Sequence, residues 1–164
     1  MDISRIRALR GPNLWSRHTA VEAIVTCAEH ERSLATLPGF EARLRALFPG
    51  VGALRRKPEE ASLAHVLETA TLALQTQAGC PVTFSRVTQT VDPGVYQVVV
   101  EYSEEKVGRQ ALEAAESLIR AALAEAGAAF DSEATIHALR ELDEDIRLGP
   151  STGSIVNAGV ARGI

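Results

Sequence analysis

The sequence lacks the features that mark membrane-spanning, secreted and disulfide-rich proteins. No uncharged apolar run approaches the roughly 20 residues that a bilayer span requires, so we expect no membrane association. The N-terminal segment 1–5 has no apolar stretch suited to export, which favours a cytoplasmic location. The only two cysteines, Cys27 and Cys80, do not make a disulfide framework, and we expect buried free thiols.

The chain also lacks an excess of basic charge. It has 17 Lys and Arg against 21 Asp and Glu, a net charge of −4. The single basic run, residues 55–57, is followed at once by Pro58 and the acidic pair Glu59 and Glu60. Because a phosphate footprint needs several basic positions on one face, nucleic acid is not an expected partner. We interpret the run as a solvated loop.

Nucleotide and zinc signatures are absent as well. The sequence contains no Walker-type phosphate loop, no G-x-G-x-x-G, no G-x-S-x-G and no pair of C-x-x-C elements. With 46% hydrophobic residues, the chain has enough apolar material for one sizeable core or two small lobes. Composition by itself therefore indicates an α+β domain and nothing more specific.

The first third of the chain predicts a small α/β lobe over about residues 1–57. Apolar and polar residues alternate over 3–10, and a second strand is expected over 20–27, after a break at Gly11-Pro12-Asn13. Pro38-Gly39 opens a short amphipathic helix that Pro49-Gly50 closes. The Gly-, Pro- and charge-rich stretch 51–60 predicts a loop and a lobe boundary.

The remainder predicts a helix–β-hairpin–helix–helix lobe over about residues 58–147, and the fold class is α+β. Ser62 is the expected N-cap of a helix that ends near residue 78 with Gly79 beyond it. Strands over 82–91 and 95–102 flank the turn Asp92-Pro93-Gly94. We expect Ser103 to cap a helix running to about residue 126, and Asp131 or Ser132 to start a last helix through Ile146.

Three stretches in order carry a resemblance to a known family. They are Leu9-Arg10-Gly11-Pro12-Asn13-Leu14-Trp15, then residues 79–84 with 93–102, then Leu148-Gly149-Pro150-Ser151-Thr152 with Ala161-Arg162-Gly163-Ile164. Together they resemble the N-terminal domain of cyanophycin synthetase over essentially the whole chain. The resemblance implies that residues 1–147 form this domain and that 148–164 are a linker and the start of a missing ATP-grasp domain. We therefore expect the chain to be a piece of a longer protein.

The resemblance implies a parent ligase that uses ATP and Mg to polymerise aspartate and arginine. Its product, cyanophycin, has a poly-aspartate backbone with one arginine on each β-carboxyl. ATP-grasp and Mur-ligase-like domains of the same chain would do the ligation. This fragment is then expected to need no cofactor, to ligate nothing alone and to anchor the growing polymer. An architectural role, as a brace for the ATP-grasp domain, is a further alternative.

In some members the same domain cuts the polymer to make primers, and one segment here is similar to the His-x-x-Glu-His motif of that activity. The segment is His65-Val66-Leu67-Glu68-Thr69. On one helix face two histidines can hold Zn²⁺ while the glutamate activates water. His65 is thus the candidate metal ligand and Glu68 the candidate catalytic residue. Because Thr69 replaces the second histidine, we expect a degenerate site without zinc, and the simplest interpretation is a solvated polar helix face.

A surface that holds cyanophycin should carry charges of both signs, because each unit has a guanidinium and a carboxylate. The alternative is that such residues are ordinary surface charges, which contribute little individually. The candidates for polymer contact are Arg5, Arg7, Arg10, Arg86, Glu101, Glu104, Glu105 and Arg109.

Overall fold

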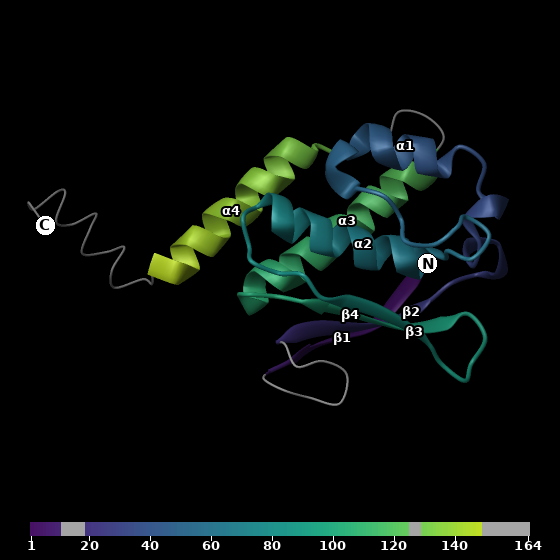
Figure 1. The fold of residues 1–164 in the computed structure, drawn as a ribbon, viewed down its shortest axis with the longest axis horizontal. Coiled ribbons are helices and arrows are strands. Elements are labelled where there is room, and N and C mark those ends of the chain that lie inside the picture. Colours follow the sequence, from purple (N-terminus) through teal and green to yellow (C-terminus); the bar gives the residue numbers. More distant parts are fainter. Residues whose placement is uncertain (11–18, 125–128, 149–164) are drawn as a thin grey trace, which may run out of the picture.

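The computed structural model describes residues 1–10, 19–124 and 129–148, which form a layer of helices on a four-stranded antiparallel sheet (Figure 1). The sheet order is β1-β2-β4-β3. The strands are β1 (Asp2–Leu9), β2 (Ala20–Thr26), β3 (Ser85–Gln89) and β4 (Val95–Glu101). The α-helices are α1 (Phe40–Leu47), α2 (Leu63–Gln77), α3 (Glu105–Leu123) and α4 (Ser132–Leu148), with 3-10 turns at Glu29–Glu31, Leu34–Thr36 and Pro49–Val51.

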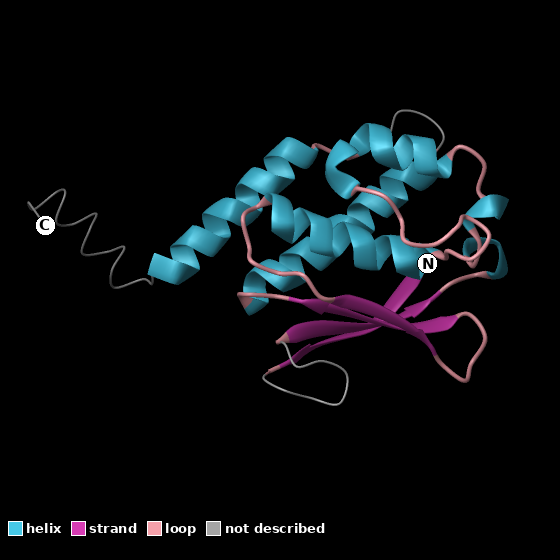
Figure 2. Cartoon of the chain, viewed as in Figure 1, coloured by secondary structure: helices cyan, strands magenta, loops and turns pink. Residues whose placement is uncertain are grey.

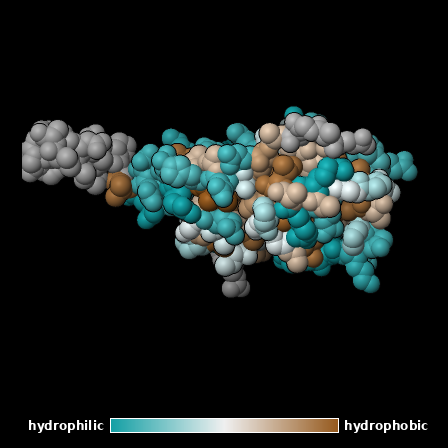
Figure 3. Space-filling view, turned by 90° about the horizontal axis from the view of Figure 1, so that it is seen from above, coloured by the Kyte–Doolittle hydropathy of each residue, from teal (hydrophilic) through white to brown (hydrophobic). Residues whose placement is uncertain are grey.

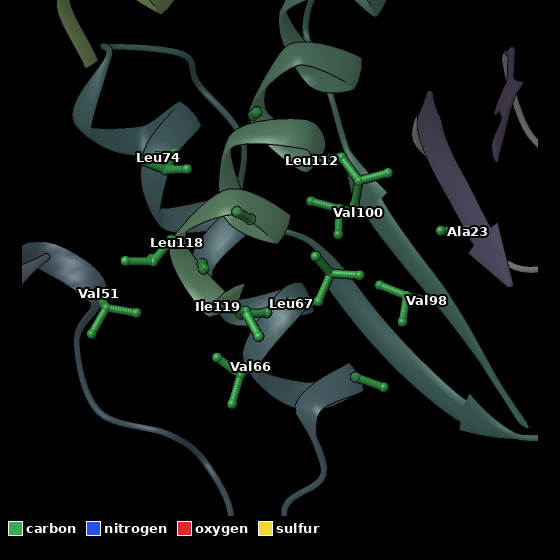
Figure 4. Packing of buried hydrophobic residues seen from close by; sticks show 14 of the residues in the cluster. Ala23, Val51, Val66, Leu67, Leu74, Val98, Val100, Leu112, Leu118 and Ile119 are labelled. Carbon is green, nitrogen blue, oxygen red and sulfur yellow. The ribbon is translucent and has the colours of Figure 1, made fainter. Parts of the chain in front are cut away.

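All the helices lie on one side of the sheet (Figure 2). The alternation of side chains along a strand explains this, because residues two apart share a face. Val98 and Val100 of β4 and Ala23 of β2 are buried and point toward α2 and α3 (Figure 4). The two helices meet them with apolar stripes at helical spacing, including Leu67 and Leu112. One hydrophobic core therefore lies between sheet and helices.

The predicted α+β class is confirmed, and the elements follow in the predicted order. Ser62 caps α2 with its side-chain oxygen, which accepts the Ala64 N–H at 3.1 Å. Asp131 does the same for the N–H of Ala134 before α4, at 3.0 Å. The β3–β4 turn uses Gly94 at φ +77°, a left-handed backbone conformation that favours glycine.

One cap was predicted wrongly. The N-cap of α3 is Glu104 rather than Ser103, and it makes no side-chain capping hydrogen bond. The backbone N–H of Tyr102 donates to the carbonyl of Thr19 at 3.0 Å, which extends the pairing of β4 past its last strand residue. The chain therefore turns into the helix one residue later than the sequence suggested.

The sheet combines strands from both sides of the boundary expected near residue 57. Its central pairing joins β2 to β4, with Ala23 opposite Val98. The core likewise includes side chains from both segments, among them Phe40 and Leu44 of α1 and Leu118 of α3. The two segments therefore share one sheet and one core.

Three further predictions concern the cysteines, membrane-spanning helices and the segments outside the described residues. Cys27 and Cys80 are free thiols and both are buried, as predicted. None of the helices in the described residues has the length and apolarity needed to cross a bilayer. The exposed surface of α4 is mostly hydrophilic where Figure 3 shows it. The predicted break at Gly11-Pro12-Asn13 and the predicted linker after Leu148 lie outside the described residues.

Candidate functional site

A pocket of about 730 Å³ opens beside β3, the strand at the edge of the described sheet. Its volume falls within the range of about 300–1,000 Å³ typical of ligand sites. The first turns of α2, the loop before it and the whole length of β3 form its walls. The lining residues are Leu54, Arg55, Arg56, Glu60, Ala61, His65, Glu68, Thr69, Ser85, Arg86, Val87, Thr88 and Gln89.

Glu68 is the buried carboxylate of this pocket, with 7% of its surface exposed. Its Oε1 accepts a hydrogen bond from the Ser85 hydroxyl at 2.8 Å and another from the Arg55 guanidinium at 2.9 Å. Burial raises the pKa of Glu68, and the Ser85 hydrogen bond and the charges of Arg55 and Arg56 offset this only in part. A buried carboxylate that is incompletely compensated in a pocket marks a candidate functional site.

His65 lies one helical turn before Glu68 and is held by the start of its own helix. The backbone N–H of Ser62 donates to its Nδ1 at 3.0 Å, which completes a capping box. Burial, with a smaller contribution from the charge of Arg56, lowers the pKa of His65 from 6.5 to about 4. At neutral pH the ring is therefore uncharged, and because Nδ1 accepts, its proton resides on Nε2.

The side chains of His65, Glu68 and Thr69 do not fit a catalytic zinc ion. A histidine that ligates through Nε2 normally donates a hydrogen bond from Nδ1, which fixes the opposite tautomer. In this chain the backbone N–H of Ser62 occupies the Nδ1 of His65 as a donor, so Nε2 carries the proton. The second histidine of the motif is Thr69, and the described residues contain no group of three His, Cys, Asp or Glu side chains placed for a metal.

The solvated-face interpretation of this segment is wrong for Glu68. β3 packs against α2 and places the Ser85 hydroxyl on the carboxylate, so the side chain is removed from water. His65 and Thr69 are partly buried beside it and also line the pocket. The polar face of α2 therefore packs against β3 of the predicted hairpin, a contact that sequence periodicity does not reveal.

The residues predicted to contact polymer lie in separate places. Only Arg86 lines the pocket. Arg10 and Arg109 both bind Glu105, at 2.7 and 3.1 Å, and the two arginines lower the pKa of that carboxylate. Glu101 accepts the backbone N–H groups of Thr83 and Phe84 at 2.8 and 3.0 Å, and Glu104 occupies the N-cap of α3.

Arg5 and Arg7 belong to a second buried carboxylate, Glu22 of β2, which is 1% exposed. Arg7 donates to both of its oxygens, at 2.6 and 3.3 Å, and Arg5 lies 3.8 Å away. The Gln97 side-chain amide donates to it from β4 at 2.5 Å. Burial by itself raises the pKa of Glu22, but the Arg7 and Gln97 hydrogen bonds and the two guanidinium charges outweigh it and lower the pKa.

The predicted site residues did not include Arg55, Arg56, Glu60 or Ser85, which also line the pocket. The basic run was visible in the sequence and its loop character is correct, since Arg55 keeps 68% of its side chain exposed. Arg55 nevertheless reaches Glu68 and Ser85. No local pattern signals this, because the contact depends on β3, which comes 30 residues later in the chain.

Comparisons with known proteins identify the family of this chain. Residues 23–124 match the family model of the cyanophycin synthase-like N-terminal domain. The chain is 36% identical over 182 aligned positions to a cyanophycin synthetase from Trichormus variabilis, 34% over 180 to one from a Synechocystis species, and 32% over 179 to one from Geminocystis herdmanii. Each alignment covers 100% of this chain and 20% of the relative, so the chain spans about a fifth of their length. The matched residues include α2, β3, β4 and every residue that lines the pocket. The chain therefore belongs to the cyanophycin synthase-like N-terminal domain family.

Proposed function

We propose that this chain is the polymer-binding module of a cyanophycin synthetase and that the pocket beside β3 holds the polymer. The observation that carries the proposal is the charge in the pocket. Arg56 and Arg86 line it without an ion pair to any described residue, Glu60 lines it as an exposed carboxylate, and the buried Glu68 lines it already paired with Arg55. Each unit of cyanophycin offers a carboxylate and a guanidinium, so both signs of charge find a partner there.

Arginine is suited to binding the carboxylate of each polymer unit. Its planar guanidinium donates two parallel hydrogen bonds to a carboxylate, and it stays charged at all physiological pH values. The side chains of Arg56 and Arg86 are exposed at the pocket wall, so they can reach the carboxylates of the polymer. In contrast, Arg10 and Arg109 already share Glu105, and Arg7 is engaged by Glu22.

Ligation belongs to the rest of the protein in this proposal. ATP-grasp and Mur-ligase-like domains of a longer chain would use ATP and Mg, and this domain would keep the growing end close to them. The zinc hydrolase alternative finds no support in the donor set, because Thr69 and the Nε2–H tautomer of His65 are both unsuitable. The architectural alternative predicts that the domain has no affinity for the polymer.

Co-sedimentation with insoluble cyanophycin over a series of salt concentrations tests the proposal. We expect the wild-type chain to bind and the bound fraction to fall as salt rises, because exposed ion pairs are screened. The double variant Arg56→Ala/Arg86→Ala should lose roughly tenfold in affinity at low salt, from two charged contacts of about 0.5–1 kcal/mol each.

A matched control is available elsewhere on the surface. Arg10→Ala/Arg109→Ala removes the same charge from the Glu105 cluster and should bind nearly as well as wild type. Equal losses in both double variants would mean that net charge alone governs binding, which contradicts the pocket assignment. Absence of wild-type binding at every salt concentration would refute the polymer-binding function and favour the brace.

A further inference from the structure

The edge of β3 that faces the pocket carries, in a regular pattern, backbone N–H and C=O groups that bond to no other described strand. The carbonyl of Phe84 accepts from Glu101 at 2.9 Å and the N–H of Thr90 donates to Val95 at 3.0 Å. In an antiparallel ladder, residues alternate between those bonded to the neighbouring strand and those that point the other way. The even-numbered residues of β3 therefore form the backbone hydrogen bonds to β4. The N–H and C=O groups of Ser85, Val87 and Gln89 point away from β4, toward the open edge of the sheet.

No described strand lies beyond β3, because the sheet order ends with it. All five of its residues line the pocket instead. An added strand would lie about 4.8 Å from β3, and the pocket occupies that side of it. An exposed edge of this kind is a template for pairing with another extended chain.

We infer that the poly-aspartate backbone of cyanophycin binds in the pocket as a fifth strand, hydrogen-bonded to Ser85, Val87 and Gln89. The inference rests on the proposed function and specifies how the polymer is recognised. The main chain supplies hydrogen bonds that do not depend on charge. The arginine-bearing side chains supply the ion pairs.

The charges around the edge fit this occupant on both faces of the added strand. The side chain of Ser85 points toward α2, where it contacts Glu68, and residues opposite Ser85 and Val87 would project there too. Residues opposite Arg86 would project to the other face, toward its guanidinium. Because every unit of the homopolymer carries the same two charges, each face needs a group that pairs with one of them. Glu60 offers an exposed carboxylate, Glu68 offers one that Arg55 and Ser85 also contact, and Arg86 and Arg56 offer cations.

Synthetic cyanophycin segments with methylated backbone amides test the main-chain contribution directly. A strand uses only every second N–H toward one neighbour, so a segment methylated at alternate aspartates can still turn its free amides to β3. We expect it to bind the 164-residue chain within about threefold of the unmodified segment. A segment methylated at every aspartate keeps all of its charges but should lose at least tenfold in affinity, since each hydrogen bond lost costs roughly three- to tenfold.

The complementary change is made in the protein. Val87→Pro removes an N–H that points away from β4, and proline is tolerated at such edge positions. Val87→Ala also shortens the side chain but keeps the N–H, so it is the reference: we expect Val87→Pro to bind roughly tenfold more weakly than Val87→Ala, with the same salt dependence. Gln89→Pro with Gln89→Ala repeats the comparison at an exposed position if Val87→Pro lowers the thermal midpoint.

The outcomes separate this inference from the proposed function. If the unmodified segment binds but the fully methylated segment and both proline variants bind equally well, the polymer is held by side chains alone and the fifth strand is refuted. If the unmodified segment does not bind wild type at all, the proposed function fails and the inference fails with it. Weaker binding of the fully methylated segment, and of each proline variant relative to the alanine variant at the same position, supports the fifth strand.

Discussion

Glu22 and Glu68 are both carboxylates buried beside the same sheet, yet their surroundings shift their pKa in opposite directions. Glu22 receives hydrogen bonds from Arg7 and Gln97, and its pKa is lowered. Glu68 receives hydrogen bonds from Ser85 and Arg55, and burial still raises its pKa. The difference is the extent to which fixed donors compensate for burial. The compensated carboxylate joins three strands of the sheet, and the under-compensated one lines the pocket.

The same contrast holds for the cations. Around Glu22 and Glu105 every arginine named for polymer contact is already engaged by a carboxylate of the domain. In the pocket, Arg55 is engaged by Glu68, but Arg56 and Arg86 have no ion pair with the described residues. Free charges at a concave site are available to a ligand, whereas satisfied pairs mainly hold strands and helices in register. The presence or absence of an ion pair therefore distinguishes the arginines around Glu22 and Glu105 from Arg56 and Arg86 in the pocket, although all of them carry the same charge.

The largest expected effect comes from removing the compensated charge. Glu22→Gln should lower the free energy of unfolding by about 2 kcal/mol, because charge-assisted hydrogen bonds contribute about 1.5–3 kcal/mol. Glu68→Gln is the matched variant and should change it by less than about 1 kcal/mol, since its charge is poorly compensated. Urea unfolding at pH 7 measures both, and equal losses would remove the distinction between the two carboxylates.

The pH dependence of stability sharpens the comparison further. A lowered pKa means that the stability contributed by Glu22 is present above 4.5 and is lost as pH falls through the folded-state value. A raised pKa means that the contribution of Glu68 is present below 4.5 and is lost as pH rises through its folded-state value. Urea titrations from pH 3 to 7 should show that Glu22→Gln weakens the acid-induced loss and Glu68→Gln weakens the decline above pH 4.5.

A smaller effect is expected from titration of His65. Its pKa of about 4 predicts that the ring stays neutral at pH 5.5, with the proton on Nε2. Nitrogen-15 NMR of the imidazole reports both charge and tautomer, and an unperturbed histidine that titrates near 6.5 provides the reference. A ring half-protonated at pH 6.5, or protonated on Nδ1 when neutral, would contradict the capping box and reopen the zinc question.

The last prediction is that a substitution restoring the sequence motif has no effect. Thr69→His completes His-x-x-Glu-His, but the Nδ1 of His65 still accepts the N–H of Ser62. We expect less than 0.1 zinc per chain, roughly the background, after dialysis of wild type and variant. Among the described residues, His65 lacks the outer-shell acceptor that orients a ligating histidine, and loss of such a partner costs about 10–100-fold in metal affinity. One tightly held zinc per Thr69→His chain would show that the tautomer gives way and that Thr69 alone disables the site.

Local sequence patterns were sufficient for most elements of the fold. The alternation over 3–10, the cap at Ser62 and the Asp92-Pro93-Gly94 turn act over a few residues, so they indicate structure without reference to the rest of the chain. The cap of α3 was misplaced because Tyr102 pairs with Thr19, far away in sequence. The pairing of β2 with β4 could not be predicted from local sequence patterns either, since it joins segments about 75 residues apart.

Part of the candidate site could likewise be predicted from local sequence, and part depends on contacts between distant segments. His65 and Glu68 were identified by the resemblance of segment 65–69 to the His-x-x-Glu-His motif, which is a local property of the sequence. The sequence by itself determined the class of the domain, its helices and hairpin, and the incomplete metal motif. Only the tertiary structure decided which charges are paired, which tautomer His65 adopts in its pocket and which edge of the sheet stays open. Those outcomes depend on burial and on partners contributed by distant segments, and neither exists until the chain has folded.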